Sequence, residues 1–254
     1  MTTYFCYGSK HVGTTITASS ANAFYPVSNL QDQQTIREFR TADTVTTANL
    51  VIDLGSAMAV TDVILAGNMV DRTIGLTSLT IEANATDSWG APSFSSGAIT
   101  DIAKGILIAQ FASQSYRYWR LVLTNSGGTY AGFGAMFMGT RLAQPVSFGW
   151  ELGFQSRDVV IEGLYGQVYG QSRNYQRYLA MPLNVISKAE VETLIDMVAA
   201  VGITLPVWCV PDPEEGALPV QQAAAGQYRL TAIPHFTNST YGLWDTALSL
   251  QELI

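Results

Sequence analysis

The sequence predicts a mainly β protein of two domains, a jelly-roll β-sandwich over residues 1–142 and a β-rich α+β domain with one amphipathic helix over residues 146–254. Short alternating or β-branched runs, separated by Gly, Asn and Ser breaks, fill the first region, which is typical of a sandwich. Pro145 biases the residue before it toward extended backbone and marks the junction. One segment of the second region has helical periodicity. A chain of 254 residues is long enough for two such domains.

The strands of the first domain are predicted from alternation. Residues Leu50–Gly55 form a short apolar run that ends in glycine, as expected for a core strand of the sandwich. Residues 116–124 alternate and provide its companion strand. Residues 78–83, 106–111 and 136–139 add further strands, and no helical stripe interrupts the series. The first domain is therefore expected to be entirely β.

The second domain is expected to begin with strands and to contain one helix over residues 187–201. A strand over residues 158–164 is expected to pair with residues 175–182. Ser187 and Glu190 then form a capping box, because each side chain can bond the other residue's backbone amide. Apolar residues recur at positions i, i+3, i+4 and i+7, and Gly202 follows at the C′ position. The apolar residues are Val191, Leu194, Ile195 and Val198.

Composition limits the classes of partner. Charged residues make up 13% of the chain, about half the usual fraction. Either other subunits cover part of the surface, or the surface is rich in Ser, Thr and Asn as in secreted β proteins. The net charge of −7 provides no basic footprint for nucleic acid. No run reaches the roughly 18 apolar residues of a membrane span, and the N-terminus has no apolar stretch of signal-peptide length.

The two cysteines, Cys6 and Cys209, lie near opposite ends of the chain. Neither has a partner at the spacing of a zinc site or a redox motif. They are expected to be free thiols from a reducing compartment. One long-range disulfide is the alternative.

Catalytic motifs are absent from the sequence. The two histidines, His11 and His235, are far apart, and neither lies in an H-E-x-x-H pattern. There is no G-x-S-x-G elbow and no Walker loop. A glycan hydrolase would need two carboxylates that face each other across a cleft, and nothing marks such a pair. The protein is expected not to be an enzyme, with glycan hydrolysis as the less favoured alternative.

Aromatic residues in predicted loops are the candidate binding residues. Tyr25, Trp89 and Tyr130 offer ring faces that can stack on sugars, and Arg72 can hydrogen-bond hydroxyl groups. The alternative for the aromatic residues is a place in the core or at a subunit interface. Asn29-Leu30-Gln31-Asp32 offers the side-chain oxygens of Asn29 and Asp32 to a Ca²⁺ ion, although an Asx-type turn is the favoured explanation of this segment. No other cofactor is expected.

Residues 14–142 resemble the discoidin, or F5/8 type C, domain, which has a galactose-binding-like fold. The resemblance implies a jelly roll that binds glycans through its loops. The cysteine pair of the secreted members is missing, and Phe39 replaces the usual tryptophan. No sugar-binding residue carries over, because the loops of the family vary. The matching segments are Ala18-Ser19-Ser20 to Tyr25-Pro26-Val27-Ser28-Asn29-Leu30, Phe39-Arg40-Thr41, Leu50–Gly55, Tyr116–Leu121 and Met136–Gly139.

The pattern Ala-Ser-Ser-x-x-x-x-Tyr-Pro-x-x-Asn-Leu is also similar to tail proteins of bacteriophages. Residues 157–169, residues 177–182, the capped helix and residues 206–208 resemble the ring-forming β domain of distal tail or minor tail proteins. This resemblance implies a homo-oligomer, a hexameric ring that joins the tail tube to the tip. Tube, hub and baseplate proteins would be its partners, and the virion tail, assembled in the host bacterial cytoplasm, its location.

Two functions follow from these resemblances. The first is a structural component of the tail tip or baseplate, with an outward β-sandwich for docking or glycan binding. The alternative is a carbohydrate-binding adhesion module that recognises host cell-surface glycans. One molecule can have both functions.

Overall fold

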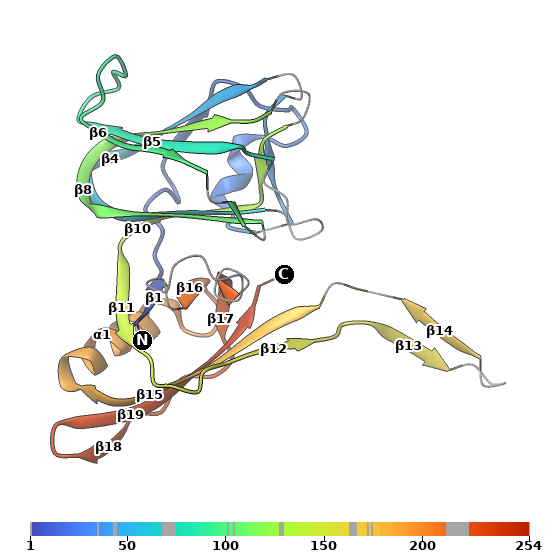
Figure 1. The fold of residues 1–254 in the computed structure, drawn as a ribbon, viewed down its shortest axis with the longest axis vertical. Helices are drawn as coiled ribbons and strands as arrows, with labels where there is room; N and C mark the ends of the chain where they lie inside the picture. The colour runs from blue at the N-terminus through green and yellow to red at the C-terminus, as the bar shows by residue number, and fades with distance from the viewer. Residues whose placement is uncertain are drawn as a thin grey trace.

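The computed structural model describes residues 2–34, 36–42, 45–67, 75–100, 102–103, 105–126, 130–162, 167–171, 173, 175–211 and 224–253. The fold is mainly β, with a jelly-roll sandwich above a second large antiparallel sheet in the view of Figure 1. The described residues contain one α-helix. The predicted fold class is therefore confirmed.

Two long strands build the jelly roll, β4 (Thr47–Ala66) and β8 (Ile106–Thr124). They pair along their length, but the register breaks between Asp53 and Met58. The pair bends there, so each strand contributes to both layers of the sandwich (Figure 1). The remaining elements of this domain are β2 (Thr15–Ala18), η1 (Val27–Gln31), β3 (Phe39–Arg40), β5 (Ser78–Asn84), β6 (Phe94–Ile99), β7 (Ile102–Ala103), β9 (Gly132–Phe133) and β10 (Ala135–Gly139).

The predicted core strand and its companion lie side by side. Leu50 is paired with Leu121, and Ile52 with Trp119, and all four side chains are buried. Their neighbours in sequence point to the outer face, as strand alternation requires. Burial of alternate residues on the two layers creates the first core, which removes apolar surface from water.

The second sheet combines strands from both ends of the chain. Its order is β11 (Arg141–Pro145), β1 (Thr2–Cys6), β16 (Val207–Pro211), β17 (Gly226–Leu230), β19 (Leu243–Glu252), β15 (Gln176–Ser187) and β12 (Glu151–Gln155), with β18 (Thr237–Thr240) on β19. The jelly roll is thus inserted between β1 and β11. The expected boundaries placed residues 1–13 in the sandwich, whereas β1 pairs with β11 and β16. Alternation in a short strand indicates its buried face but not the sheet that it joins.

The helix α1 (Lys188–Val201) covers one face of the second sheet and begins as predicted. The Ser187 hydroxyl accepts from the Glu190 amide, and the Glu190 carboxylate accepts from the Ser187 amide. Its buried stripe contains Met197, whereas Ile195 is exposed and differs from the prediction. On the helical wheel, positions 195 and 197 lie equally far from the line of residues 191, 194, 198 and 201, so the periodicity alone does not decide which of the two is buried. In the described part of the chain, no helix has the length and apolar character that a membrane crossing requires.

A third core joins the two sheets. Phe137 and Ile64 from the lower layer of the jelly roll pack against Trp208 and Cys6 from the second sheet. Cys6 and Cys209 are both free, as predicted, and both are buried. Phe5 is the residue opposite Cys209, so Cys6 points to the other face of the sheet. A disulfide between the two cysteines is therefore excluded by geometry.

A separate two-stranded ribbon, β13 (Val159–Glu162) and β14 (Val168–Gln171), extends away from the end of the second sheet (Figure 1). We call this ribbon the arm. The prediction that residues 158–164 pair with residues 175–182 is wrong, because β13 pairs with β14 and β15 pairs with β12 and β19. Residues 168–171 are nearer to β13 in the sequence than residues 175–182. Pairing with them closes a shorter loop, which costs less conformational entropy.

Candidate functional site

Three chain segments meet at one end of the jelly roll. Thr47 and Ser78 are both aligned with Thr124, so the loops next to these residues leave the sheet at the same end. Backbone hydrogen bonds hold the segments together there. The Arg40 amide donates to the Tyr25 carbonyl at 3.1 Å. The Thr41 amide donates to the Ala131 carbonyl at 2.9 Å. The loop end is therefore a defined surface.

Arg40 lies between two tyrosine rings at this end. Its guanidinium carbon is 4.1 Å from the ring centre of Tyr25 and 4.2 Å from that of Tyr130. Glu38 forms an ion pair and a hydrogen bond with the same guanidinium. Burial alone lowers the pKa of Arg40, but the Glu38 hydrogen bond and charge raise it above its ordinary value. The cluster of Tyr25, Glu38, Arg40 and Tyr130 is the candidate site.

The candidate site combines a hydrogen-bond donor with aromatic faces. Its aromatic rings are partly exposed, and 23% of the Arg40 side-chain surface is accessible to solvent. A guanidinium donates to several hydroxyl groups in a fixed geometry, and aromatic faces pack against the C–H faces of sugars. Phe24, beside Tyr25, is 87% exposed and adds an apolar face at the rim. A fixed donor between two rings can therefore orient a polyol.

The structure brings together two of the predicted sugar-binding residues. Tyr25 and Tyr130 lie on either side of Arg40. Arg72 lies outside the described residues. Trp89 lies in the hairpin beyond Asn84, the far end of β5 from the loop end. The length of β5, about 20 Å, separates Trp89 from the two tyrosines. Its role in sugar binding stays a prediction for a separate surface.

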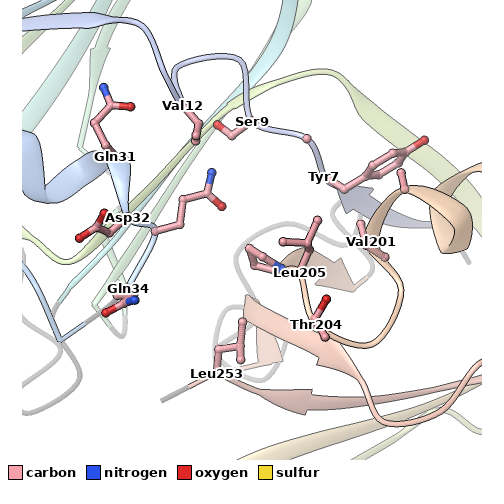
Figure 2. Close-up of a pocket in the computed structure, with 14 residues that line it drawn as sticks. Tyr7, Ser9, Val12, Gln31, Asp32, Gln34, Val201, Thr204, Leu205 and Leu253 are labelled. Carbon is pink, nitrogen blue, oxygen red and sulfur yellow. The ribbon is translucent and has the colours of Figure 1, made fainter.

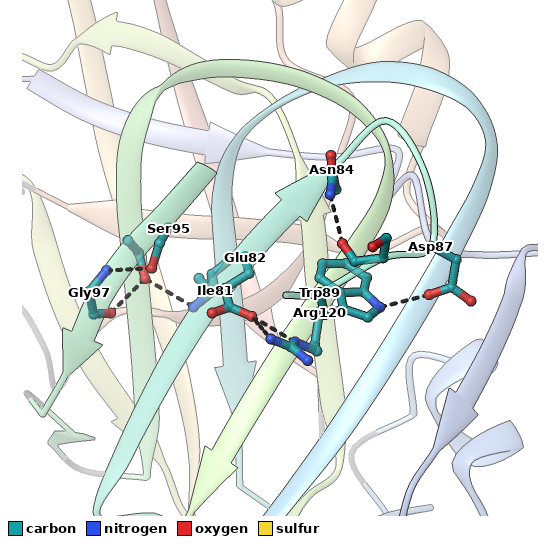
Figure 3. Close-up of polar contacts among 10 residues, drawn as sticks. Ile81, Glu82, Asn84, Asp87, Trp89, Ser95, Gly97 and Arg120 are labelled. Carbon is teal, nitrogen blue, oxygen red and sulfur yellow. Dashed lines mark hydrogen bonds and ion pairs between the residues drawn. The ribbon is translucent and has the colours of Figure 1, made fainter. Parts of the chain in front are cut away.

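Trp89 has its own polar surroundings, shown in Figure 3. Its indole N–H donates to Asp87 at 2.7 Å. The guanidinium carbon of Arg120 is 4.7 Å from the Trp89 ring centre, and Arg120 also bonds Glu82. The hairpin thus repeats the combination of an arginine, an aromatic ring and a carboxylate, with one ring in place of two.

The predicted calcium ligands already have partners in the chain. The Asn29 amide group donates to the Glu38 carbonyl at 2.7 Å. The Asp32 carboxylate accepts from Arg37 at 2.6 Å. Among the residues that the structure describes, no group of three or more His, Cys, Asp or Glu side chains could hold a metal ion. Calcium binding by Asn29 and Asp32 stays a prediction.

Sequence reasoning missed Glu38 and Arg40 as site residues. Phe39 between them is buried in the core, whereas Arg40 in β3 and Glu38 just before it form an ion pair with each other. A charge on each side of a buried aromatic residue was the available signal. The contacts with Tyr25 and Tyr130 depend on loop closure over many residues, which alternation does not reveal.

The arm is a second candidate surface. Val160, Ile161, Val168 and Tyr169 are 60–67% exposed. Ile161 is paired with Tyr169, whereas Val160 points to the opposite face, so both faces of the ribbon carry exposed apolar side chains. An isolated two-stranded ribbon is marginally stable in water. The arm therefore has the character of a surface that another molecule covers.

A cavity of about 530 Å³ lies where the two domains meet. Figure 2 shows Val12, Gln31 and Gln34 on its jelly-roll side and Val201, Leu205 and Leu253 on the other. Val12 is 45% exposed and Leu205 54% exposed. The lining includes one carboxylate, that of Asp32, which forms an ion pair with Arg37. The cavity is thus an apolar hollow with side-chain amides at its rim.

No family model matches the chain, and no curated protein matches it. Solved structures do match. A chitosan-binding module from a Paenibacillus sp. IK-5 chitosanase/glucanase is 20% identical, with a TM-score of 0.44, over 53% of this chain and 100% of that chain. A Streptococcus pneumoniae fucose binding module is 11% identical, with a TM-score of 0.43, over 53% and 98%. The lectin domain of lectinolysin, complexed with Lewis B antigen, is 16% identical, with a TM-score of 0.43, over 52% and 96%.

Proposed function

We propose that this protein binds carbohydrate through the loop end of its jelly roll. The main observation behind this proposal is a cluster of four residues. Tyr25 and Tyr130 pack against the Arg40 guanidinium, and Glu38 forms an ion pair with it. Loops at the end of a rigid sandwich are a common place for recognition. The proposal is for binding without catalysis, because the only carboxylate of the cluster is bound by Arg40.

The cluster would recognise a sugar by shape and by hydrogen bonds. The Arg40 guanidinium donates to neighbouring hydroxyl groups, and Glu38 fixes its orientation. Tyr25 and Tyr130 position the sugar ring against their apolar surfaces. The Tyr–Arg–Tyr stack keeps the donors in place before the ligand arrives, which reduces the entropic cost of binding.

A glycan array and titration calorimetry test the proposal. The protein is screened against neutral and acidic oligosaccharides, with and without calcium. For the sugar that binds, Arg40→Met is expected to weaken affinity at least about tenfold, because charged hydrogen bonds to the ligand are lost. Arg117→Met is the matched control, since Arg117 packs on Tyr118 and pairs with Asp53, away from the candidate site. Absence of binding across the array overturns the proposal.

The arm favours a second function, a structural component of a phage tail tip. Its two apolar faces are exposed on a chain of low charge content, which fits a subunit that other copies cover. We propose that the second domain forms a homo-oligomeric ring, with six copies as the expected number. The ring would join tail tube, hub and baseplate proteins in the virion tail, and the jelly roll would face outward.

Light scattering and electron microscopy of the purified protein test the second function. A closed ring is the expected result. The variant Ile161→Lys with Tyr169→Lys is expected to shift the protein toward the monomer, because it places charge on one face of the arm. A strict monomer at high concentration overturns the assembly proposal and leaves the carbohydrate proposal standing.

A further inference from the structure

We propose that the arm of one copy docks into the inter-domain cavity of a second copy, with the Ile161–Tyr169 pair as the inserted group. The proposal rests on the assembly function given above and names the two surfaces that meet. It makes the contact heterologous, because a different surface of each copy takes part.

The Ile161–Tyr169 pair forms an apolar knob on one face of the arm. The two residues are directly opposite each other in β13 and β14, so their side chains lie together on one face. The Tyr169 hydroxyl donates to Gln167 at 2.7 Å, and Gln171 lies further along the same strand. The knob is therefore apolar at its centre and carries side-chain amides at its edge.

The cavity offers the complementary arrangement. Val12 and Leu205 stand on opposite walls and are about half exposed, so the hollow presents apolar surface to solvent (Figure 2). Gln33, Gln34 and Thr204 provide uncharged polar groups around them. An apolar knob edged with amides thus meets an apolar hollow edged with amides, and no charge has to be buried unpaired.

A second copy is the occupant because the chain's own arm is held elsewhere. The arm continues from β12 and β15, whose pairing fixes its direction away from the body (Figure 1). The knob and the hollow are on the same molecule but do not meet within it. A contact of this kind joins copies head to tail, and it closes into a ring when the rotation between copies allows.

Cysteine cross-linking tests the contact. The variants Ile161→Cys and Leu205→Cys are mixed under mild oxidation, and the native thiols are protected because Cys6 and Cys209 are buried. Cross-linked dimer is expected in the mixture and absent from each variant alone. The double variant is expected to give a ladder of cross-linked oligomers. Val160→Cys, mixed with Leu205→Cys, is the matched control, because Val160 faces the other side of the arm.

The outcomes separate the inference from the assembly function. Oligomers that form without an Ile161→Cys to Leu205→Cys cross-link overturn the docking contact and leave the assembly. Equal cross-linking of the Val160→Cys control overturns it as well. A protein that remains monomeric under all conditions overturns both.

Discussion

His11 secures the crossover that leads from β1 into the jelly roll. Its Nδ1 is 2.6 Å from the Ser9 hydroxyl oxygen, and its Nε2 is 3.1 Å from the Leu30 carbonyl oxygen. Because a carbonyl oxygen can only accept, Nε2 carries the proton and Nδ1 accepts from Ser9. Burial lowers the pKa of His11 to about 4, although the hydrogen bond to Leu30 raises it in part. The buried ring is therefore neutral at physiological pH.

The neutral state of His11 predicts a loss of stability in acid. An unfolded histidine binds a proton near pH 6.5, whereas the folded ring does so near pH 4. Between these values the unfolded state holds more protons, so the free energy of unfolding falls as the pH falls. The full contribution is present above pH 6.5, and up to about 3 kcal/mol is lost by pH 4. Urea unfolding at several pH values across this window measures the loss.

Two variants provide the controls for the pH dependence. His11→Gln removes the titrating group and is expected to flatten the dependence in this window. His235→Gln is the matched control, because it makes the same substitution at an exposed position. Stability of the unmodified protein that stays constant from pH 6.5 to pH 4 contradicts the prediction.

At the scale of elements, the bend in β4 carries the strand from one layer of the sandwich into the other. The bend contains Gly55, whose φ of 77° lies in the left-handed region. The Asp53 carboxylate accepts from the Gly55 amide at 2.8 Å and from two nitrogens of Arg117 at 2.7 and 2.8 Å. The hydrogen bond with Arg117 and that with Gly55 lower the pKa of Asp53 to about 2. One strand pair therefore turns from one layer into the other at a defined place.

Gly55→Ala is expected to destabilise the protein by about 1 kcal/mol, because an L-residue is strained at this φ. An added Cβ would meet nothing within 4 Å, so the cost is conformational and not steric. Gly90→Ala is the matched control, since Gly90 also has open space around it but no positive φ. Chemical denaturation measures the difference between the two variants. Equal stability of Gly55→Ala and Gly90→Ala would show that the bend does not need the glycine.

Local patterns predicted those parts of the fold whose partners are close or whose signal is repeated. Short apolar and alternating runs identified β5 and separate parts of the long strands β4 and β8, and the capping box identified α1. The place of β1 in the second sheet was not predictable, because its neighbours lie more than a hundred residues away. The candidate site was also predictable only in part. Tyr25 and Tyr130 were predicted as loop aromatics, whereas Arg40 became visible only with the loops assembled around it.

At the scale of the whole molecule, the third core couples the jelly roll to the second sheet. Phe137, Trp208 and Cys6 are all buried where the two domains meet, and Ile64 is buried with them. A large apolar interface of this kind makes relative motion of two domains costly. The candidate site and the arm are therefore expected to keep a fixed geometry with respect to each other.

Phe137→Ala is expected to separate the unfolding of the two domains. The native protein should unfold in one calorimetric transition, because the shared core couples its halves. Loss of the Phe137 ring costs about 3–5 kcal/mol of packing at the interface and should produce two transitions. Phe133→Ala removes an equally buried ring that lies wholly within the jelly-roll core against Phe39, so it should lower stability without this separation. A native protein with two transitions, or a Phe137→Ala variant that keeps one, would show that the third core does not couple the domains.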